Sequence, residues 1–405
     1  MREMTSPTDA AARATPAAAQ QPDWPDPARV DRVRRRLRAL PPPVAPAAVD
    51  RLRGRLAEVA HGRALLLQGG DCAETFAGNT PAHIRANLRT LLHTATLLEV
   101  ASGLPVVPVG RVAGQYAKPR SNPYDTDGLP SYRGDLVNAT TPTAAARTPD
   151  PARLLRAHAD ARATLGVLDA VAAETRTELF AGHEALLLDY EIPLTRRAPD
   201  GARRGLSGHF LWIGERTRQP GGAHVEFARG IANPVGVKVG PGTTPAEVLA
   251  YADALDPHRS PGRLTLISRM GADRVADALP PLVTAVAAAG HPVIWLCDPM
   301  HGNTVVANSG HKTRHFDTIL AEIRGFFAVH AALGTHPGGL HLEFTGDDVT
   351  ECLGGSQDLR DTDLPTRYDT ACDPRLNARQ TLDLTCLIAK TLLTPTTPRK
   401  PLNIA

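Results

Sequence analysis

The sequence contains little cysteine, no long apolar run and no strong excess of charge of either sign. Five cysteines at irregular spacing in 405 residues exclude a disulfide framework, so we expect a reducing, cytoplasmic location. No apolar stretch approaches the roughly 18 to 20 residues of a membrane-spanning helix, and the first residues lack the apolar core of a signal peptide. The net charge of +3, with one short arginine-rich stretch near residue 35, gives no support for nucleic-acid or membrane binding.

Lysine is also scarce, because only five of the 45 basic residues are Lys. In a chain that uses arginine almost everywhere, a remaining lysine indicates a place where a compact ammonium is needed and a planar guanidinium does not fit. Lys118 and Lys238 lie in segments dense with motifs, so we expect both to be functional. Lys390 and Lys400 we interpret as surface residues that remain by chance.

Seven short apolar runs end at a charged or metal-binding side chain, and a weaker eighth run near the end of the chain does the same. Segments with helical spacing, at residues 247–255, 276–290 and 316–334, lie between the later runs. This alternation predicts a parallel sheet closed into a (β/α)8 TIM barrel, in which strand ends deliver side chains to one catalytic mouth. The runs end at Cys72, Arg111, Glu215 with Arg216, Lys238, Arg269, His301 and Glu343, and the weaker one at Asp373.

The composition along the chain predicts four parts. Residues 1–22 are expected to form a disordered tail and residues 23–62 a helical extension, since helical spacing occurs at 27–40 and 46–60. The catalytic barrel is predicted over residues 63–392 and a C-terminal tail over 393–405. The interval from 111 to 215 is the longest between strand ends and must hold additional structure, including a helix over 151–180.

Four residues at these strand ends suit a metal site: Cys72, His301, Glu343 and Asp373. One thiolate, one imidazole and two carboxylates favour Mn2+, Co2+, Fe2+ or Zn2+ over Ca2+ or Mg2+, which take oxygen ligands. Alternation along the strand ending at Glu343 places its side chain inside the barrel, where a carboxylate is costly unless it is paired or ligates an ion.

A second set is cationic and suits an anionic substrate. Arg111, Arg216, Lys238 and Arg269 follow four of the strands, and guanidinium groups bind phosphate and carboxylate through charge-assisted contacts. The segment at residues 118–121, with Lys118 and Arg120, adds enough positive charge for a second phosphate. The alternative for any one of these cations is an ion pair with a barrel carboxylate.

Eleven longer motifs stand in one order along residues 63–392 and together resemble the class II, plant-type 3-deoxy-D-arabino-heptulosonate 7-phosphate (DAHP) synthases. They are QGGDCAETF (68–76), RVAGQYAKPRS (111–121), SYRGDLVN (131–138), WIGERTRQ (212–219), NPVGVKVGP (233–241), LTLISRMG (264–271), CDPMHGNT (297–304), KTRHFD (312–317), GTHPGGLHLEFTG (334–346), VTECLGG (349–355) and CDPRLN (372–377).

This resemblance implies a TIM barrel that condenses phosphoenolpyruvate with erythrose 4-phosphate at one divalent metal, with Mn2+ or Co2+ preferred and Fe2+ or Zn2+ as alternatives. It is the entry step of the shikimate pathway. Matched by motif, the residues fall into three groups. The implied metal ligands are Cys72, His301, Glu343 and Asp373; the phosphoenolpyruvate contacts are Arg111, Glu215, Arg216, Lys238 and Arg269; and the erythrose 4-phosphate contacts are Lys118, Pro119, Arg120 and Ser121.

The chemistry of this condensation gives roles to four of these residues. The metal acts as a Lewis acid on the aldehyde oxygen, and Glu215 positions or deprotonates the water that captures C2 of phosphoenolpyruvate. Lys238 and the arginines align the reactants, and Lys238 or Arg269 assists loss of phosphate. The group that protonates the new alkoxide stays open between His301 and a metal-bound water.

The interval between residues 139 and 208 is short compared with the long members of the family. There, the long members carry extra helices that form inhibitory aromatic amino-acid sites and part of the tetramer interface. We therefore expect a short subgroup enzyme without feedback inhibition that serves a secondary pathway. We also expect a homo-oligomer, with a dimer favoured; a chorismate mutase partner has no support in the sequence.

Two other readings remain open. The chain could make the amino analogue of the product from an imino sugar phosphate, and only a substrate assay separates that activity from DAHP synthesis. It could also be a binding subunit with an inactive barrel, although every expected site residue is present. A metallohydrolase of the amidohydrolase type would need an HxH motif at the first strand, where this chain has Gly70, Asp71 and Cys72.

Overall fold

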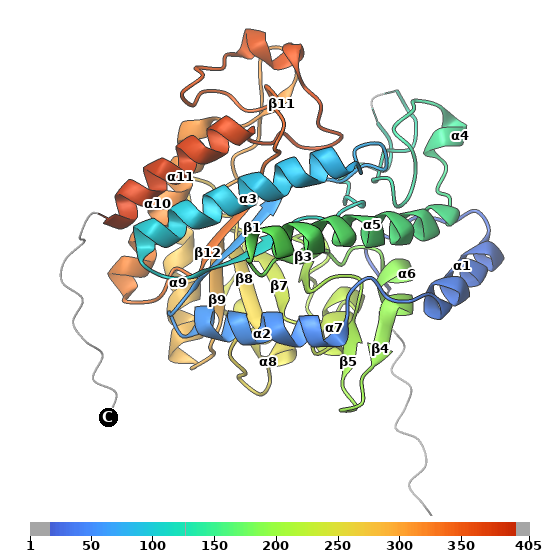
Figure 1. Cartoon of the computed structure of the whole chain (residues 1–405), viewed down its shortest axis with the longest axis horizontal. Coiled ribbons are helices and arrows are strands. Elements are labelled where there is room, and N and C mark those ends of the chain that lie inside the picture. Colours follow the sequence, from blue (N-terminus) through green and yellow to red (C-terminus); the bar gives the residue numbers. More distant parts are fainter. Residues whose placement is uncertain (1–16, 126, 394–405) are drawn as a thin grey trace, which may run out of the picture.

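A closed barrel of eight parallel strands forms the centre of the protein. The structure is a computed structural model that describes residues 17–125 and 127–393. The strands hydrogen bond in the order β1, β12, β9, β8, β7, β6, β3, β2 and back to β1, which confirms the predicted (β/α)8 fold (Figure 1). The barrel strands are β1 (Leu65–Gly70), β2 (Val106–Gly110), β3 (Phe180–Glu184), β6 (Phe210–Ile213), β7 (Val235–Val239), β8 (Leu264–Ser268), β9 (Ile294–Cys297) and β12 (Gly339–Glu343).

Helices between the strands cover the outside of the barrel, and local sequence signals set their ends. Thr244 and Glu247 form a reciprocal capping box before α8, with Pro245 at the first helical position. Gly103 adopts a left-handed conformation, with φ of 68°, and ends α3. The outer helices are α3 (Pro81–Ser102), α5 (Ala152–Thr175), α7 (Ala223–Arg229), α8 (Pro245–Leu255), α9 (Val275–Ala288), α10 (Phe316–Leu333) and α11 (Ala378–Leu393).

Smaller elements lie in the connections between barrel strands. Two antiparallel hairpins, β4 with β5 and β10 with β11, stand apart from the barrel sheet. The small elements are α4 (Ala144–Arg147), α6 (Leu188–Glu191), η1 (Ile192–Leu194), β4 (Thr195–Arg197), β5 (Arg203–Gly205), β10 (Val305–Val306), β11 (Lys312–Thr313) and η2 (Asp361–Thr366).

Helix α2 (Pro46–Ala60) closes the end of the barrel at which the strands begin (Figure 1). Its buried Leu52 and Leu56 pack in one cluster with interior strand residues such as Leu66 and Phe210. The other N-terminal helix, α1 (Pro27–Ala39), packs against α5 and η1. Because α2 fills the amino end of the barrel, the site is left to the carboxyl ends of the strands, where TIM-barrel active sites lie.

One of the eight predicted strands is wrong. The weak run at Asp373 is not a strand, because residues 370–375 form bends in a loop. The missing barrel strand is β3, Phe180–Glu184, which lies between β2 and β6. It belongs to the long interval from 111 to 215 and has the sequence FAGHE, in which Gly182 and His183 interrupt the apolar pattern. Since Gly182 has the carbonyl of Phe210 2.7 Å from where a Cβ would be, close strand packing accounts for the glycine.

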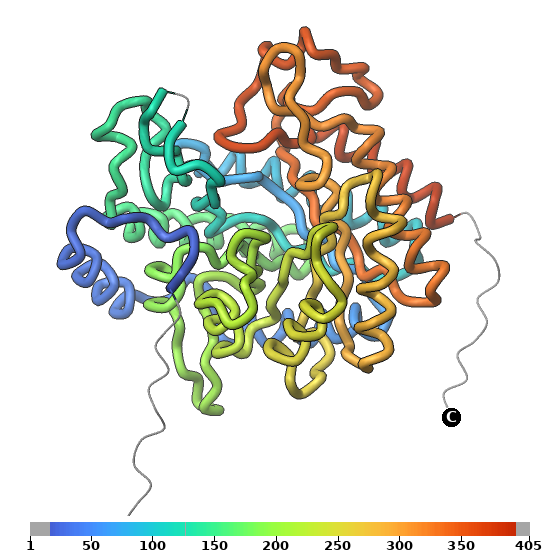
Figure 2. Tube along the Cα trace, turned by 180° about the vertical axis from the view of Figure 1, so that it is seen from behind, coloured from blue at the N-terminus to red at the C-terminus, as the bar shows by residue number. Residues whose placement is uncertain are grey.

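The described N-terminal segment packs against loops on the catalytic face of the barrel (Figure 2). Gln21 donates from Nε2 to the carbonyl of Leu186, and the backbone N–H of Arg120 donates to Gln20 Oε1 over 2.9 Å. Most of the two predicted tails, residues 1–16 and 394–405, lies outside the described residues. In the described part of the chain, no helix is long and apolar enough to cross a membrane.

Candidate active site

Glu343, the last residue of β12, lies at the centre of the barrel mouth and is fully buried. Arg111, directly after β2, donates from Nη2 to Glu343 Oε1 over 2.9 Å, and Arg314 Nη1 lies 3.0 Å from Glu343 Oε2. Burial raises the pKa of Glu343, but nearby positive groups, His301 and Lys118 foremost, hold it well below its usual value. The carboxylate is therefore ionised and surrounded by donors.

The four predicted metal ligands reach one region of the mouth and stand there as two pairs. Cys72 Sγ lies 3.6 Å from Asp373 Oδ2, and His301 Nε2 lies 3.2 Å from Glu343 Oε1. Lys118 links the pairs, since its Nζ lies 3.7 Å from Glu343 Oε1 and 3.7 Å from Asp373 Oδ2. Within residues 17–125 and 127–393, no three Cys, His, Asp or Glu side chains are arranged so that they could hold an ion.

The chemistry of this set nevertheless fits a transition metal. A thiol, an imidazole and two carboxylates are ligands that Mn2+, Co2+, Fe2+ and Zn2+ accept. Burial holds the pKa of the Cys72 thiol well above its usual value, and a coordinated cation would draw off that proton. A Lys118 ammonium between two carboxylates shows that this position already favours a positive charge.

Lys238 on β7 and His301 after β9 share one buried carboxylate, that of Asp298. Lys238 Nζ donates to Asp298 Oδ2 over 2.7 Å, and His301 Nδ1 lies 2.8 Å from the same oxygen. Because this bond fixes Nδ1, the other ring nitrogen, Nε2, faces Glu343. Burial lowers the pKa of Lys238 more strongly than Asp298 raises it, which makes its ammonium a better proton donor than an exposed lysine.

The predicted phosphoenolpyruvate contacts form the other side of the mouth. Arg269, after β8, donates from Nη2 to the carbonyl of His301 over 2.6 Å, and its Nη1 lies 3.8 Å from Glu215 Oε2. Arg218 donates to Glu215 Oε1 over 2.8 Å. Among the described residues, the buried Glu215 Oε2 has no hydrogen-bond partner. An acceptor left in this way could bind a water or a substrate hydroxyl.

The predicted erythrose 4-phosphate segment, Lys118, Pro119, Arg120 and Ser121, contacts both sides of the mouth. Lys118 points to the metal-ligand pairs, whereas Arg120 donates from Nε to the carbonyl of Tyr132 and from Nη2 to Cys372 Sγ over 3.3 Å. Ser121 Oγ accepts from Nη2 of Arg216 over 2.8 Å, so the exposed Arg216 side chain bridges to this segment. The two predicted substrate sites are therefore adjacent.

The sequence patterns did not predict three residues that lie at the mouth, Asp298, Arg314 and Glu184. Asp298 and Arg314 carry buried charges within motifs that resemble the family, and each pairs with a predicted site residue. Glu184 ends β3, and a Cβ at Gly214 would lie 2.0 Å from its Oε1, which among described residues has no hydrogen-bond partner. The long interval before Glu215 was the one signal that could have revealed Glu184, because a barrel strand had to lie in it.

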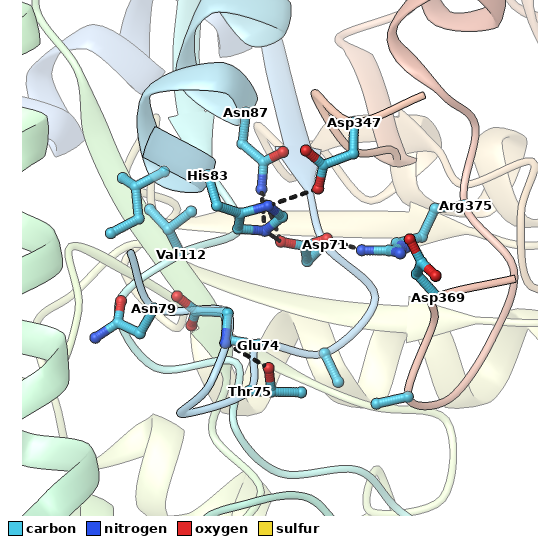
Figure 3. A pocket seen from close by; sticks show the side chains of 14 residues that line it. Asp71, Glu74, Thr75, Asn79, His83, Asn87, Val112, Asp347, Asp369 and Arg375 are labelled. Carbon is cyan, nitrogen blue, oxygen red and sulfur yellow. Dashed lines mark hydrogen bonds and ion pairs between the residues drawn. The ribbon is translucent and has the colours of Figure 1, made fainter. Parts of the chain in front are cut away.

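A cavity of about 180 Å³ is lined by Asp71 and Ala73, the two neighbours of Cys72 in the chain, and by residues of helix α3 and of the loops after β1 and β12 (Figure 3). Its lining includes Asp71, Glu74, His83, Asp347 and Arg375 and none of the predicted phosphoenolpyruvate contacts. Glu74 accepts from three successive backbone N–H groups, those of residues 113–115, and burial raises its pKa to about 6. This carboxylate ties the loop after β1 to the loop after β2.

Comparisons with known proteins agree with the motifs. The model of the class-II DAHP synthetase family matches residues 8–175 and 171–389. Phospho-2-dehydro-3-deoxyheptonate aldolase AroG of Mycolicibacterium smegmatis is 50% identical over 430 residues, covering 93% of this chain and 92% of its own. The aldolase of the same name from Streptomyces coelicolor is 49% identical over 426 residues, covering 92% of this chain and 95% of its own.

A solved structure of the corresponding aldolase from Francisella tularensis SCHU S4 also matches, with a TM-score of 0.48 and 16% identity. The match covers 85% of this chain and 91% of that chain.

Proposed function

The chain belongs to the class-II DAHP synthetase family, and we propose that its barrel mouth condenses phosphoenolpyruvate with erythrose 4-phosphate to give DAHP and inorganic phosphate. One observation carries the assignment of the reaction to this site. The ionised Glu343 carboxylate lies directly beside cations that are expected to bind a substrate with two anionic groups, a carboxylate and a phosphate. Cys72, His301 and Asp373 lie close to the same carboxylate.

Phosphoenolpyruvate would bind on the side formed by Arg111, Lys238 and Arg269, because its carboxylate and phosphate need several donors at fixed positions. These side chains lie in or directly after strands β2, β7 and β8 and are themselves held by Glu343, Asp298 and the carbonyl of His301. A site fixed in this way holds the reacting carbons in place, and such positioning can supply roughly 7 to 11 kcal/mol of the barrier.

Erythrose 4-phosphate would bind next to it, with its phosphate on the segment of Lys118, Arg120 and Ser121. A divalent ion held by Cys72, His301, Glu343 and Asp373 would polarise the aldehyde oxygen of this substrate. Enzymes of the family generally depend on a metal, and for this chain we propose Mn2+ or Co2+, with Fe2+ and Zn2+ as alternatives.

The remaining steps fall to Glu215 and Lys238. As the new carbon–carbon bond forms, C2 of phosphoenolpyruvate gains positive charge, and the Glu215 carboxylate would orient water toward it through its unpartnered Oε2. Lys238, with its lowered pKa, would give a proton to the leaving phosphate as the hemiketal collapses.

An assay with purified protein tests the proposal. The protein is loaded with Mn2+ or Co2+ and incubated with both substrates, while loss of enolpyruvate absorbance and release of phosphate are followed. We expect one phosphate to be released for each phosphoenolpyruvate consumed. Glu215→Gln, which keeps the size of the side chain, should retain substrate binding and lose most of the turnover. Absence of turnover with either metal would contradict the proposal, and preference for an imino sugar phosphate would identify the amino-DAHP reaction instead.

We also propose that the enzyme is a cytoplasmic homo-oligomer, with a dimer favoured, that supplies a secondary pathway. Light scattering of the purified protein at several concentrations would give the oligomeric state.

A further inference from the structure

Asp71 is a buried carboxylate that neither binds substrate nor ligates metal in the proposed reaction. It immediately precedes Cys72 and is 3% exposed. Its side chain is held by groups from three directions: Arg375 Nη1, His83 Nε2 at 2.7 Å and Asn87 Nδ2 at 2.7 Å. Figure 3 shows these side chains converging on Asp71 along the wall of the cavity.

Arg375 connects Asp71 to the loop that contains Asp373. Arg375 is two residues after Asp373 and is 7% exposed. Besides its ion pair with Asp71, it donates from Nη2 and Nε to the fully buried Glu351 over 2.7 and 3.0 Å, and its own backbone N–H donates to the same carboxylate. A guanidinium with two such partners has little freedom, so the path of the chain through Asp373 is fixed relative to Asp71.

His83 connects Asp71 to the loop after β12. His83 lies in the first turn of α3, and its Nδ1 is 2.8 Å from Asp347 Oδ2. Asp347 is four residues after Glu343. Asn87, one turn further along α3, donates to Asp71 and accepts from the backbone N–H of Gly346 over 2.6 Å. Helix α3 therefore holds the loops after β1 and β12 together through polar contacts.

We propose that Asp71, His83 and Arg375 are positioning residues of the metal site. Together they set the relative positions of the ligands Cys72, Asp373 and Glu343. The three ligands come from separate strands or loops. Backbone hydrogen bonds join β12 to β1 and to Leu376, and the Asp71 network adds side-chain contacts between the loops that continue from them. Asp71 contacts Arg375 of the Asp373 loop directly. It reaches the loop after β12 through His83 and Asn87. The inference rests on the proposed function, because it assumes that those ligands bind an ion.

The test measures binding of Co2+ apart from activity. Co2+ bound to a cysteine thiolate gives a charge-transfer band, so titration with Co2+ alone reports both affinity and the Cys72 bond. Loss of a group that orients a ligand typically weakens metal binding about 10- to 100-fold. We expect this loss for Asp71→Asn and for Arg375→Met, with a weaker charge-transfer band. Turnover of these variants should recover at high Co2+. The Co2+ concentration that gives half-maximal activity should therefore change more than kcat.

Arg85→Met on the same helix is the matched control, because Arg85 pairs with the exposed Glu174, away from Asp71, and this variant should bind Co2+ like the parent. His83→Gln contacts the network from the helix side and supplies a variant should Asp71→Asn fail to fold; it should lie between the control and Arg375→Met. Folded variants that bind Co2+ within threefold of the parent would overturn the proposal. If the parent itself binds no Co2+ and turns over no substrate, the proposed function fails instead.

Discussion

The two sides of the barrel mouth are built differently. The inner side, around Glu343, is crossed by buried ion pairs and includes Arg111 of the predicted phosphoenolpyruvate contacts; the side chains of Glu343 and Arg111 are 0% and 2% exposed. On the outer side, the side chains of Arg269 and Glu215, which belong to the same set of predicted contacts, are 23% and 29% exposed. Buried charges keep one arrangement because any other leaves a charge unpaired. Partly exposed cations are tied less tightly and can adjust to a substrate that enters and leaves.

This comparison predicts that Glu343→Ala affects both stability and function. The change leaves Arg111 and Arg314 buried without their carboxylate, and removal of one partner of a buried pair costs about 3–5 kcal/mol. We therefore expect a clearly lower Tm together with loss of Co2+ binding and of turnover. Calorimetry and metal titration on the same sample measure the two effects. Unchanged stability would mean that the buried pairs do not hold this side of the mouth.

Arg269→Gln should affect substrate binding without affecting the buried ion pairs around Glu343. Hydrogen bonds to charged groups contribute about 1.5–3 kcal/mol, so we expect the KM for phosphoenolpyruvate to rise roughly 10- to 100-fold. Since Arg269 is partly exposed, the free energy of unfolding should change by less than about 1 kcal/mol, and Co2+ binding should stay near that of the parent. A fall in Tm like that expected for Glu343→Ala would remove the distinction between the two sides.

Sequence patterns selected individual residues that lie at the barrel mouth better than they revealed the contacts between those residues. Arg111, Lys238 and Glu343 end regular apolar runs, and period-two alternation was enough to place Glu343 inside the barrel. Asp298 is also adjacent to a strand end, but two ligand-type residues, Cys297 and His301, flank it and no spacing rule selects among them. Its role depends on Lys238, 60 residues away, which only the closed barrel brings to 2.7 Å.

The wrong prediction of the eighth strand also arises because tertiary contacts are not visible in a single sequence. Asp373 does reach the mouth, so its predicted role as a ligand does not require a strand, and a side chain on a loop gives the same position. In contrast, β3 is a genuine strand whose Gly182 and His183 obscure the apolar pattern. Gly182 is needed because Phe210 of the neighbouring strand lies against it, a tertiary constraint that a single sequence does not display.

The pH dependence of stability tests the helix side of the metal-ligand network. Hydrogen bonding to Asp71, reinforced by Asp347 and opposed by burial, raises the pKa of His83 to about 9. The protonated imidazole is thus favoured in the folded state, although Arg375 lies beyond Asp71 and offsets part of the attraction. The stabilisation is complete below about pH 6.5 and is lost as pH rises through about 9. We expect the free energy of unfolding to fall by about 1–2 kcal/mol over this range. The effect is reduced by solvent screening, since the His83 side chain is 22% exposed.

His83→Gln provides the comparison, because glutamine has no charge to lose over this range. Urea unfolding at several pH values between 6 and 9.5 should show a decline for the parent that the variant lacks. Parallel curves for the two proteins would mean that His83 is neutral in the folded state at neutral pH.

The smallest expected effect concerns the short interval of residues 139–208, which precedes Glu215 in the sequence. Residues 139–208 contain α5 and β3, which the barrel itself requires, and otherwise only the short α4, α6, η1 and the β4–β5 hairpin. A feedback inhibitor needs a second site whose occupancy distinguishes two states, and this interval has no long helix to spare for one. We expect Phe, Tyr and Trp, singly or combined at millimolar concentrations, to leave the initial rate nearly unchanged at subsaturating substrate. Saturable inhibition beyond about tenfold, equivalent to roughly 1.4 kcal/mol of coupling, would place an effector site on another part of the chain.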